Sequence, residues 1–263
     1  VVTAQSEIED VQPGLAVKQL NFGILKDRFP QQYELPSRHA GEIVQQRLLA
    51  KSDQGTQWIE NNALTATVDP KIMLTYREVK QNTAPSLDDI DDGQFSQYYP
   101  LLPYQPALFM EILSNLRELL PDATKSIFSG TARAVLALVA GLRDEWAKKN
   151  GDMPVISLVD FYNLVQYELQ DIIQEKTEVI KDIENDPETD AFDLKVAKAV
   201  LLLSYVPEMI PQTDSNIATA IMDDLEGEIR SNVQTKVRNS LEGSLEKYIR
   251  PDTSTDGADL RLT

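Results

Sequence analysis

The sequence contains no cysteine and one histidine, His39, among its 263 residues. Without cysteine the chain can form no disulfide, no thiolate metal site and no cysteine nucleophile, which suits a reducing cytoplasm. One histidine provides no cluster for zinc, and no Ser/His/Asp triad is recognisable around it. We expect His39, which lies at the entry to a predicted helix, to be structural or solvent-facing. We therefore predict a cytoplasmic protein without a metal site.

Nucleotide-binding and membrane motifs are also missing. The sequence has no GxxxxGK[ST] phosphate loop, no GxGxxG and no HExxH. The most apolar run, residues 197–206, is shorter than the about 20 apolar residues that span a bilayer, and no segment resembles a secretory signal. Carboxylate pairs such as Asp88 and Asp89 are adjacent in sequence, so they do not face each other across a site. None of these features indicates an enzyme or a membrane protein.

The chain has no initiator methionine and opens on Val-Val-Thr-Ala-Gln, residues 1–5. This β-branched, apolar opening is typical of the end of a buried strand, and a buried strand requires partners. A second alternating segment, residues 259–263, closes the chain. We therefore expect an incomplete piece of a larger protein, beginning inside a folded domain and cut again at its other end.

Acidic residues outnumber basic ones by 42 to 25, which gives a net charge of −17. Because the acids are spread along the chain, most of its surface should repel nucleic-acid phosphates unless a basic patch occurs locally. A similar excess is found in proteins of salt-adapted organisms, where high ionic strength screens self-repulsion. An ordinary acidic protein is the alternative, and the composition leaves both open.

Apolar residues recur mostly at helical spacing, which predicts a mainly α fold. Short strands are expected at 1–5, 33–35 and 259–263. The predicted helices span 38–52, 56–65, 107–120, 132–149, 157–184, 192–206, 214–225 and 227–248.

Three connecting segments divide these helices. The acidic stretch 87–93 predicts a linker or lid loop, and the proline-rich, aromatic stretch 98–106 predicts a stiff, extended entry to a helix. The polar stretch 184–190 predicts a domain boundary. Helix N-caps are expected at Ser129 or Thr131 and at Asp214 or Ser215. Beyond the boundary, three helices followed by a strand give the order of a winged helix.

The most distinctive feature of the sequence is an ordered set of short segments: residues 1–5, Leu-Lys-Asp-Arg-Phe-Pro at 25–30, residues 42–51, Tyr-Pro-Leu-Leu-Pro-Tyr at 99–104, and Ser-Gly-Thr-Ala-Arg at 129–133. In this order the set resembles the second half of an AAA+-type P-loop ATPase, and more narrowly the BrxC/PglY family of bacteriophage-exclusion (BREX) systems. The resemblance implies three parts: a remnant of the αβ ATPase core, a helical lid domain and a C-terminal winged helix. Their expected ranges are 1–55, 56–186 and 187–263.

The resemblance also implies roles for single residues. Thr3 and Gln5 would be sensor-1-like groups that orient water near the γ-phosphate, and Arg28 would be a finger-like arginine facing a neighbouring nucleotide. Arg133, at the start of the lid helix, would be a sensor-2-like arginine that binds phosphate oxygens. The competing interpretations are ordinary polar ends of a strand, an arginine capping a turn, and an arginine on the polar face of a core helix.

The third helix of the C-terminal part carries four cations where a helix-turn-helix would face a DNA groove: Arg230, Lys236, Arg238 and Lys247. Four glutamates among these cations favour protein contact over DNA.

The intact parent is expected to use ATP and Mg, whereas this chain, lacking the Walker A lysine and the Walker B acid, is expected to need no cofactor and to be inactive alone. Expected partners are the rest of the ATPase, other defence proteins, further copies of the chain, and DNA. The alternative functions are a helical adaptor and a winged-helix DNA-binding regulator, both without nucleotide chemistry.

Overall fold

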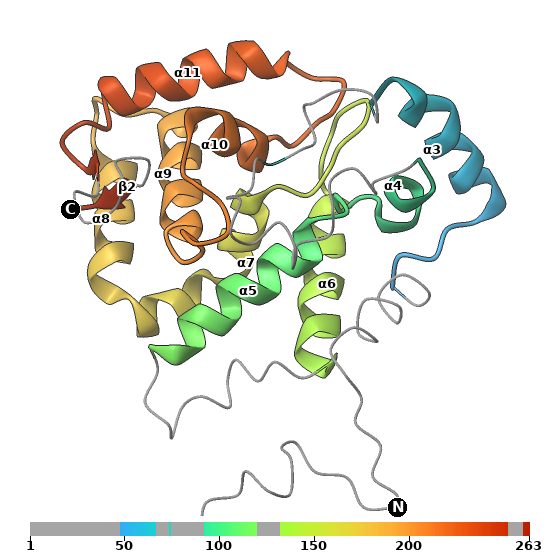
Figure 1. Ribbon diagram of the computed structural model, residues 1–263, viewed down its shortest axis with the longest axis horizontal. Helices are drawn as coiled ribbons and strands as arrows, with labels where there is room; N and C mark the ends of the chain where they lie inside the picture. The colour runs from blue at the N-terminus through green and yellow to red at the C-terminus, as the bar shows by residue number, and fades with distance from the viewer. Residues whose placement is uncertain (1–47, 67–73, 75–91, 120–131, 252–259) are drawn as a thin grey trace, which may run out of the picture.

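Helices account for most of the computed structural model, which describes residues 48–66, 74, 92–119, 132–251 and 260–263 (Figure 1). The mainly α fold class is therefore confirmed for the described residues. The helices are α3 (Asp53–Ala66), α4 (Asp92–Tyr98), α5 (Gln105–Glu118), α6 (Ala132–Trp146), α7 (Leu158–Ile172), α8 (Gln174–Asn185), α9 (Ala191–Leu203), α10 (Asp214–Ile221) and α11 (Arg230–Glu242). The strands are β1 (Ile249–Pro251) and β2 (Leu260–Leu262).

The predicted helices beyond residue 100 are all present, and α3 covers the weak helix predicted at 56–65. The helices predicted at 157–184 are α7 and α8, which are separated by Ile173. α4 was not predicted, and it starts within the predicted acidic linker. Some predicted features lie outside the described residues: the strands 1–5 and 33–35, most of the helix 38–52, His39, and the caps Ser129 and Thr131.

The stretch 98–106 is not extended, so that prediction is wrong. It forms consecutive turns around a cis Tyr99–Pro100 peptide bond and leads directly into α5. Its apolar side chains are buried, and Gln105, which is 2% exposed, fastens the turn. The Gln105 side chain donates to the Ile156 carbonyl at 2.6 Å and accepts from the Leu102 amide at 2.9 Å. The chain turns here because the turns bury these side chains, and the positions of the prolines do not indicate burial.

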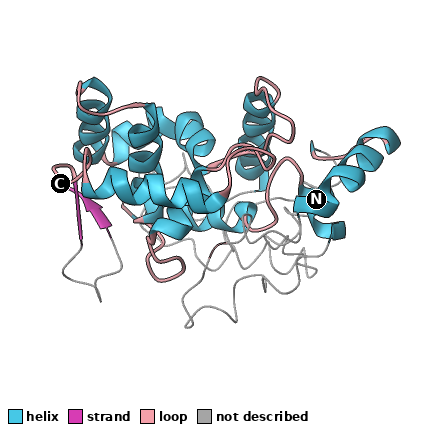
Figure 2. Cartoon of the chain, turned by 90° about the horizontal axis from the view of Figure 1, so that it is seen from above, coloured by secondary structure: helices cyan, strands magenta, loops and turns pink. Residues whose placement is uncertain are grey.

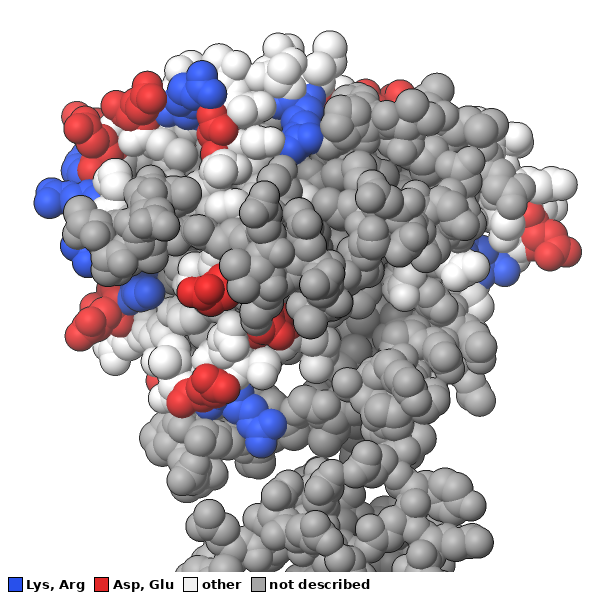
Figure 3. All heavy atoms as spheres, in the orientation of Figure 1, with Lys and Arg blue, Asp and Glu red and all other residues white. Residues whose placement is uncertain are grey.

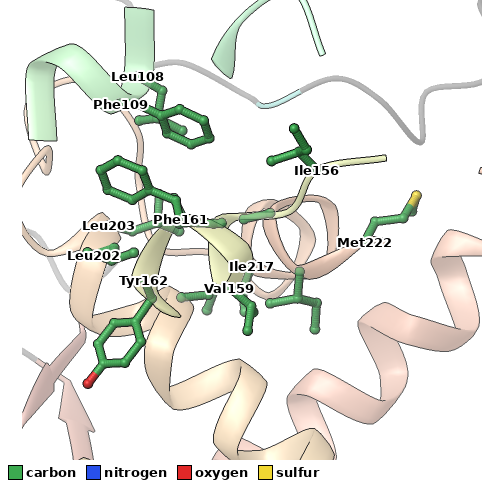
Figure 4. Packing of buried hydrophobic residues seen from close by; sticks show 14 of the residues in the cluster. Leu108, Phe109, Ile156, Val159, Phe161, Tyr162, Leu202, Leu203, Ile217 and Met222 are labelled. Atoms are coloured by element: carbon green, nitrogen blue, oxygen red, sulfur yellow. The ribbon is translucent and has the colours of Figure 1, made fainter. Parts of the chain in front are cut away.

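α9 forms the centre of the core. Its residues from Val196 to Leu203 are buried except for the half-buried Lys198, because α7, α8, α10 and α11 all pack around it. Figure 4 shows this core from close by, with Leu202 and Leu203 near Phe161 and Tyr162 of α7. The helices before and after the predicted boundary at 186 thus share one hydrophobic core. The division into domains at that point stays a prediction.

α10 and α11 are both shorter than predicted, and for α10 the reason is tertiary. Residues 223–225 pair with the chain at 153–155, where the amides of Val155 and Leu225 donate to the carbonyls of Asp223 and Met153 at 2.9 and 3.0 Å. A helix continuing to 225 could not make these bonds. The approach is so close that a Cβ on Gly151 would lie 2.3 Å from a carboxylate oxygen of Asp224.

The predicted cap of α10 at Asp214 or Ser215 is also wrong by one or two residues. Thr213 is the N-cap, and its hydroxyl accepts from the Asn216 amide at 3.2 Å. Asp214 is thereby placed in the first turn of the helix, with its carboxylate available to α11.

The chain ends in a small antiparallel hairpin, which confirms the strand predicted at 259–263. Ile249 pairs with Leu262, and Pro251 pairs with Leu260. Ile249 and Leu262 are buried, and β2 packs against α9. In Figures 1 and 2 the hairpin and α3 lie at opposite ends of the molecule.

Candidate nucleic-acid interface

Of the residues predicted to serve an ATPase site, only Arg133 belongs to a described element. It lies in the first turn of α6, although its side chain lies outside the described part. Thr3, Gln5 and Arg28 lie outside the described residues. Whether these four residues form one nucleotide site therefore stays a prediction.

The described elements that concentrate cations are α11 and the hairpin. Residues 228–263 contain six basic and six acidic residues, so this part is neutral in a chain with a net charge of −17. Three of those acids lie in the segment 252–259, outside the described residues. In Figure 3, Lys and Arg side chains lie along the upper edge, over α11, and at the side where the hairpin lies, with Asp and Glu side chains between them.

α11 lies across the surface of the helical bundle (Figure 1). Among its residues only Val233, Val237 and Ser240 are buried, and it contacts α10 and α9 through this narrow stripe. Most of the remaining surface of α11 is exposed and polar. This arrangement is the one expected of a helix that presents a face to a partner.

The three cations predicted to contact nucleic acid lie on this helix, and each has an acceptor within the chain. The Arg230 guanidinium donates to the Ser215 hydroxyl at 2.6 Å. Lys236 forms an ion pair with Glu228 at 2.6 Å. Arg238 donates through Nε to Asp214 at 3.0 Å, with a second, shorter contact through its terminal nitrogen.

Asp214 is the most heavily used of these acceptors. Partial burial would raise the pKa of its carboxyl, but hydrogen bonds from Arg238, Gln234 and the Ser215 amide outweigh burial and lower that pKa. Asp214 therefore stays ionised and holds α11 against the first turn of α10. Sequence spacing could not show this, because Asp214 and Arg238 are 24 residues apart.

Lys247 has a structural role. It pairs with Asp186 at 2.6 Å and with Glu188 at 2.8 Å, and these contacts raise the pKa of its ammonium group. The hydrogen bonds from Lys247, the Glu188 amide and the Tyr248 hydroxyl hold the pKa of Asp186 at about 2. Lys247 thus fastens the turn after α11 to the connection between α8 and α9.

Two further cations, Arg250 and Arg261, were not among the predicted site residues. They face each other directly across the hairpin, and both are exposed. Neither makes an ion pair with an acid of the described residues. The alternation in Ile-Arg-Pro and Leu-Arg-Leu could have placed both on the outer face of a hairpin, but the pairing of these two short segments was not evident.

The described residues show no site of another kind. Among them, no group of three or more His, Cys, Asp or Glu side chains could hold a metal ion, and no helix is long and apolar enough to cross a membrane. An open depression between α9 and α11 is lined partly by Asp193, but this buried acid already accepts a hydrogen bond from Ser240. α11 and the hairpin remain the best candidate for a binding surface.

No protein-family model matches the chain, and no solved structure matches it.

Proposed function

We propose that the chain is the lid and winged-helix part of a P-loop ATPase of the bacteriophage-exclusion type, and that its C-terminal unit contacts double-stranded DNA. The observation that carries the DNA contact is the arrangement of α9, α10, α11 and the hairpin. Three packed helices are followed by an antiparallel hairpin, and the third helix exposes a polar face with cations. A winged helix has this order of elements and uses its third helix for groove contact.

The electrostatics support a localised contact. A chain with a net charge of −17 is repelled by DNA over most of its surface, so binding must be confined to a part without net negative charge. Residues 228–263 are such a part. Contact there would be weak and strongly salt-dependent, as expected for one arm of a larger assembly that acts on DNA.

The ATPase assignment rests on the family resemblance and has its own test. If the chain belongs to such an ATPase, the gene that encodes it also encodes a GxxxxGK[ST] phosphate loop. The isolated chain, which has no such loop, should not bind Mg·ATP tightly. Titration with a fluorescent ATP analogue checks this, and micromolar binding with turnover would refute the claim that the chain is inactive alone.

DNA contact is tested by fluorescence anisotropy of a labelled duplex of about two helical turns, titrated with the 263-residue chain over a series of salt concentrations. We expect binding at low salt that weakens steadily as salt rises. Absence of binding at the lowest salt would refute DNA contact.

A second function, protein-contacting adaptor, is favoured by one specific observation. Lys236 and Arg238 are paired with acids of the chain, which reduces the charge that α11 can offer to phosphates. Failure of the DNA titration would support the adaptor.

A further inference from the structure

The outer face of the hairpin presents two arginines side by side. In the antiparallel register Arg250 lies directly opposite Arg261. Side chains in such positions have Cβ atoms about 4.5–5.5 Å apart. The neighbouring pair of the register fixes this face, because Ile249 is 4% and Leu262 8% exposed, which turns Arg250 and Arg261 outward.

This pairing is held from both sides. The buried Gln212 side chain accepts a hydrogen bond from the Leu260 amide and donates to the Val200 carbonyl of α9 at 2.7 Å. At the end of β2, the Thr263 amide donates to the Tyr248 carbonyl at 2.9 Å. These hydrogen bonds therefore hold the backbone of both arginines in place without a ligand.

Two like charges directly opposite each other destabilise a hairpin. The chain has 42 acidic residues with which to neutralise them, and it does neutralise Lys236, Arg238 and Lys247. Within the described residues no acid pairs with Arg250 or Arg261. The charges of Arg250 and Arg261 are thus available to a ligand, whereas Lys236 and Arg238 of α11 are paired with acids of the chain.

We propose that Arg250 and Arg261 together clamp the phosphodiester backbone of double-stranded DNA. Planar guanidinium groups bind phosphate oxygens through paired N–H donors, and two adjacent forks can hold neighbouring oxygens of one strand. This inference rests on the proposed DNA contact and assigns its main electrostatic part to the hairpin instead of α11. An exposed carboxylate on a protein partner would gain little from such a pair in water, while DNA adds counterion release for every phosphate neutralised.

The test measures duplex affinity and its salt dependence for the whole chain carrying Arg250→Ala and Arg261→Ala. Hydrogen bonds to charged groups imply a loss of about 10-fold in affinity for each arginine. Losing two phosphate contacts should also reduce the slope of log K against log salt by about 2. Arg250→Lys with Arg261→Lys keeps both charges, so it should keep most of the slope while losing part of the affinity.

A matched control removes the same charge elsewhere. Arg117 of α5 and Lys181 of α8 are exposed and form no ion pair with the other described residues. Changing both to Ala should leave the slope unchanged. The hairpin variant should also melt at the same temperature as the original chain or higher, because it relieves a repulsion.

The outcomes separate the two proposals. No binding by the original chain at low salt would refute the DNA contact and the clamp together. Binding that is unchanged in affinity and slope by the hairpin variant would overturn the clamp and leave the DNA contact to α11. An equal loss in the control variant would overturn the clamp as well, because net charge alone would then explain the effect.

Discussion

The stacked pair Phe109 and Phe161 should be a principal link between α5 and α7. The two rings lie 4.4 Å apart between centroids, at an interplanar angle of 7°, and the side chains are 1% and 0% exposed. Figure 4 shows the ring of Phe109 facing that of Phe161. Truncating either ring to Ala leaves a cavity in the core, so we expect each single change to cost about 3–5 kcal/mol of unfolding free energy.

The double variant should cost less than the sum of the two single changes. Direct stacking contributes about 0.5–1.5 kcal/mol beyond the buried area, and this part is lost only once. Urea unfolding of the original chain, both single variants and the double variant measures this coupling. Phe→Leu changes at the same positions provide a gentler series in case the Ala variants do not fold.

Tyr167 provides the matched control, because it is an aromatic residue of the same helix α7 and is 73% exposed. Tyr167→Ala should change stability by no more than about 0.5 kcal/mol. A cost below about 1.5 kcal/mol for Phe161→Ala, or strict additivity of the two changes, would show that this stack does not hold α5 on α7.

Three further predictions concern single interactions. Thr213→Ala should cost about 1 kcal/mol in urea unfolding, because it removes the N-cap of α10. Asp186 has a folded-state pKa of about 2, lowered from 3.8, so its stabilisation is complete above pH about 4 and is lost as pH falls toward 2. Asp186→Asn should abolish this part of the acid sensitivity in melting curves, and equal sensitivity in both proteins would contradict the assigned pKa. Gln212→Leu should cost about 1–3 kcal/mol by leaving the part-buried Leu260 amide without its acceptor, and it should speed hydrogen exchange at that amide. Unaltered exchange there would show that Gln212 does not anchor the hairpin.

The helical part of the fold could be predicted because it depends on local pattern. Apolar spacing located the helices beyond residue 100, including the one predicted at 192–206, which is α9. The ends of the helices could not be placed in the same way. α10 stops at Ile221 because residues 223–225 pair with a segment about 70 residues earlier. The local sequence around α10 does not indicate this pairing.

The candidate site shows the same division. The sequence alone placed Arg230, Lys236 and Arg238 on one helix, because helical periodicity fixes the relation of residues that are two to eight positions apart. Only the tertiary structure brought Asp214 to Arg238 and so decided that the charge of α11 is largely used within the chain.

By itself the sequence determined that this chain is acidic, mainly helical and without cysteine, since composition and helical periodicity are local properties. Tertiary structure decided that Arg250 and Arg261 meet on one exposed face, and that Lys247 does not remain free beside them. The physical reason is that strand register and ion pairing depend on distances between residues far apart in the chain. Those distances are set by how the whole core packs.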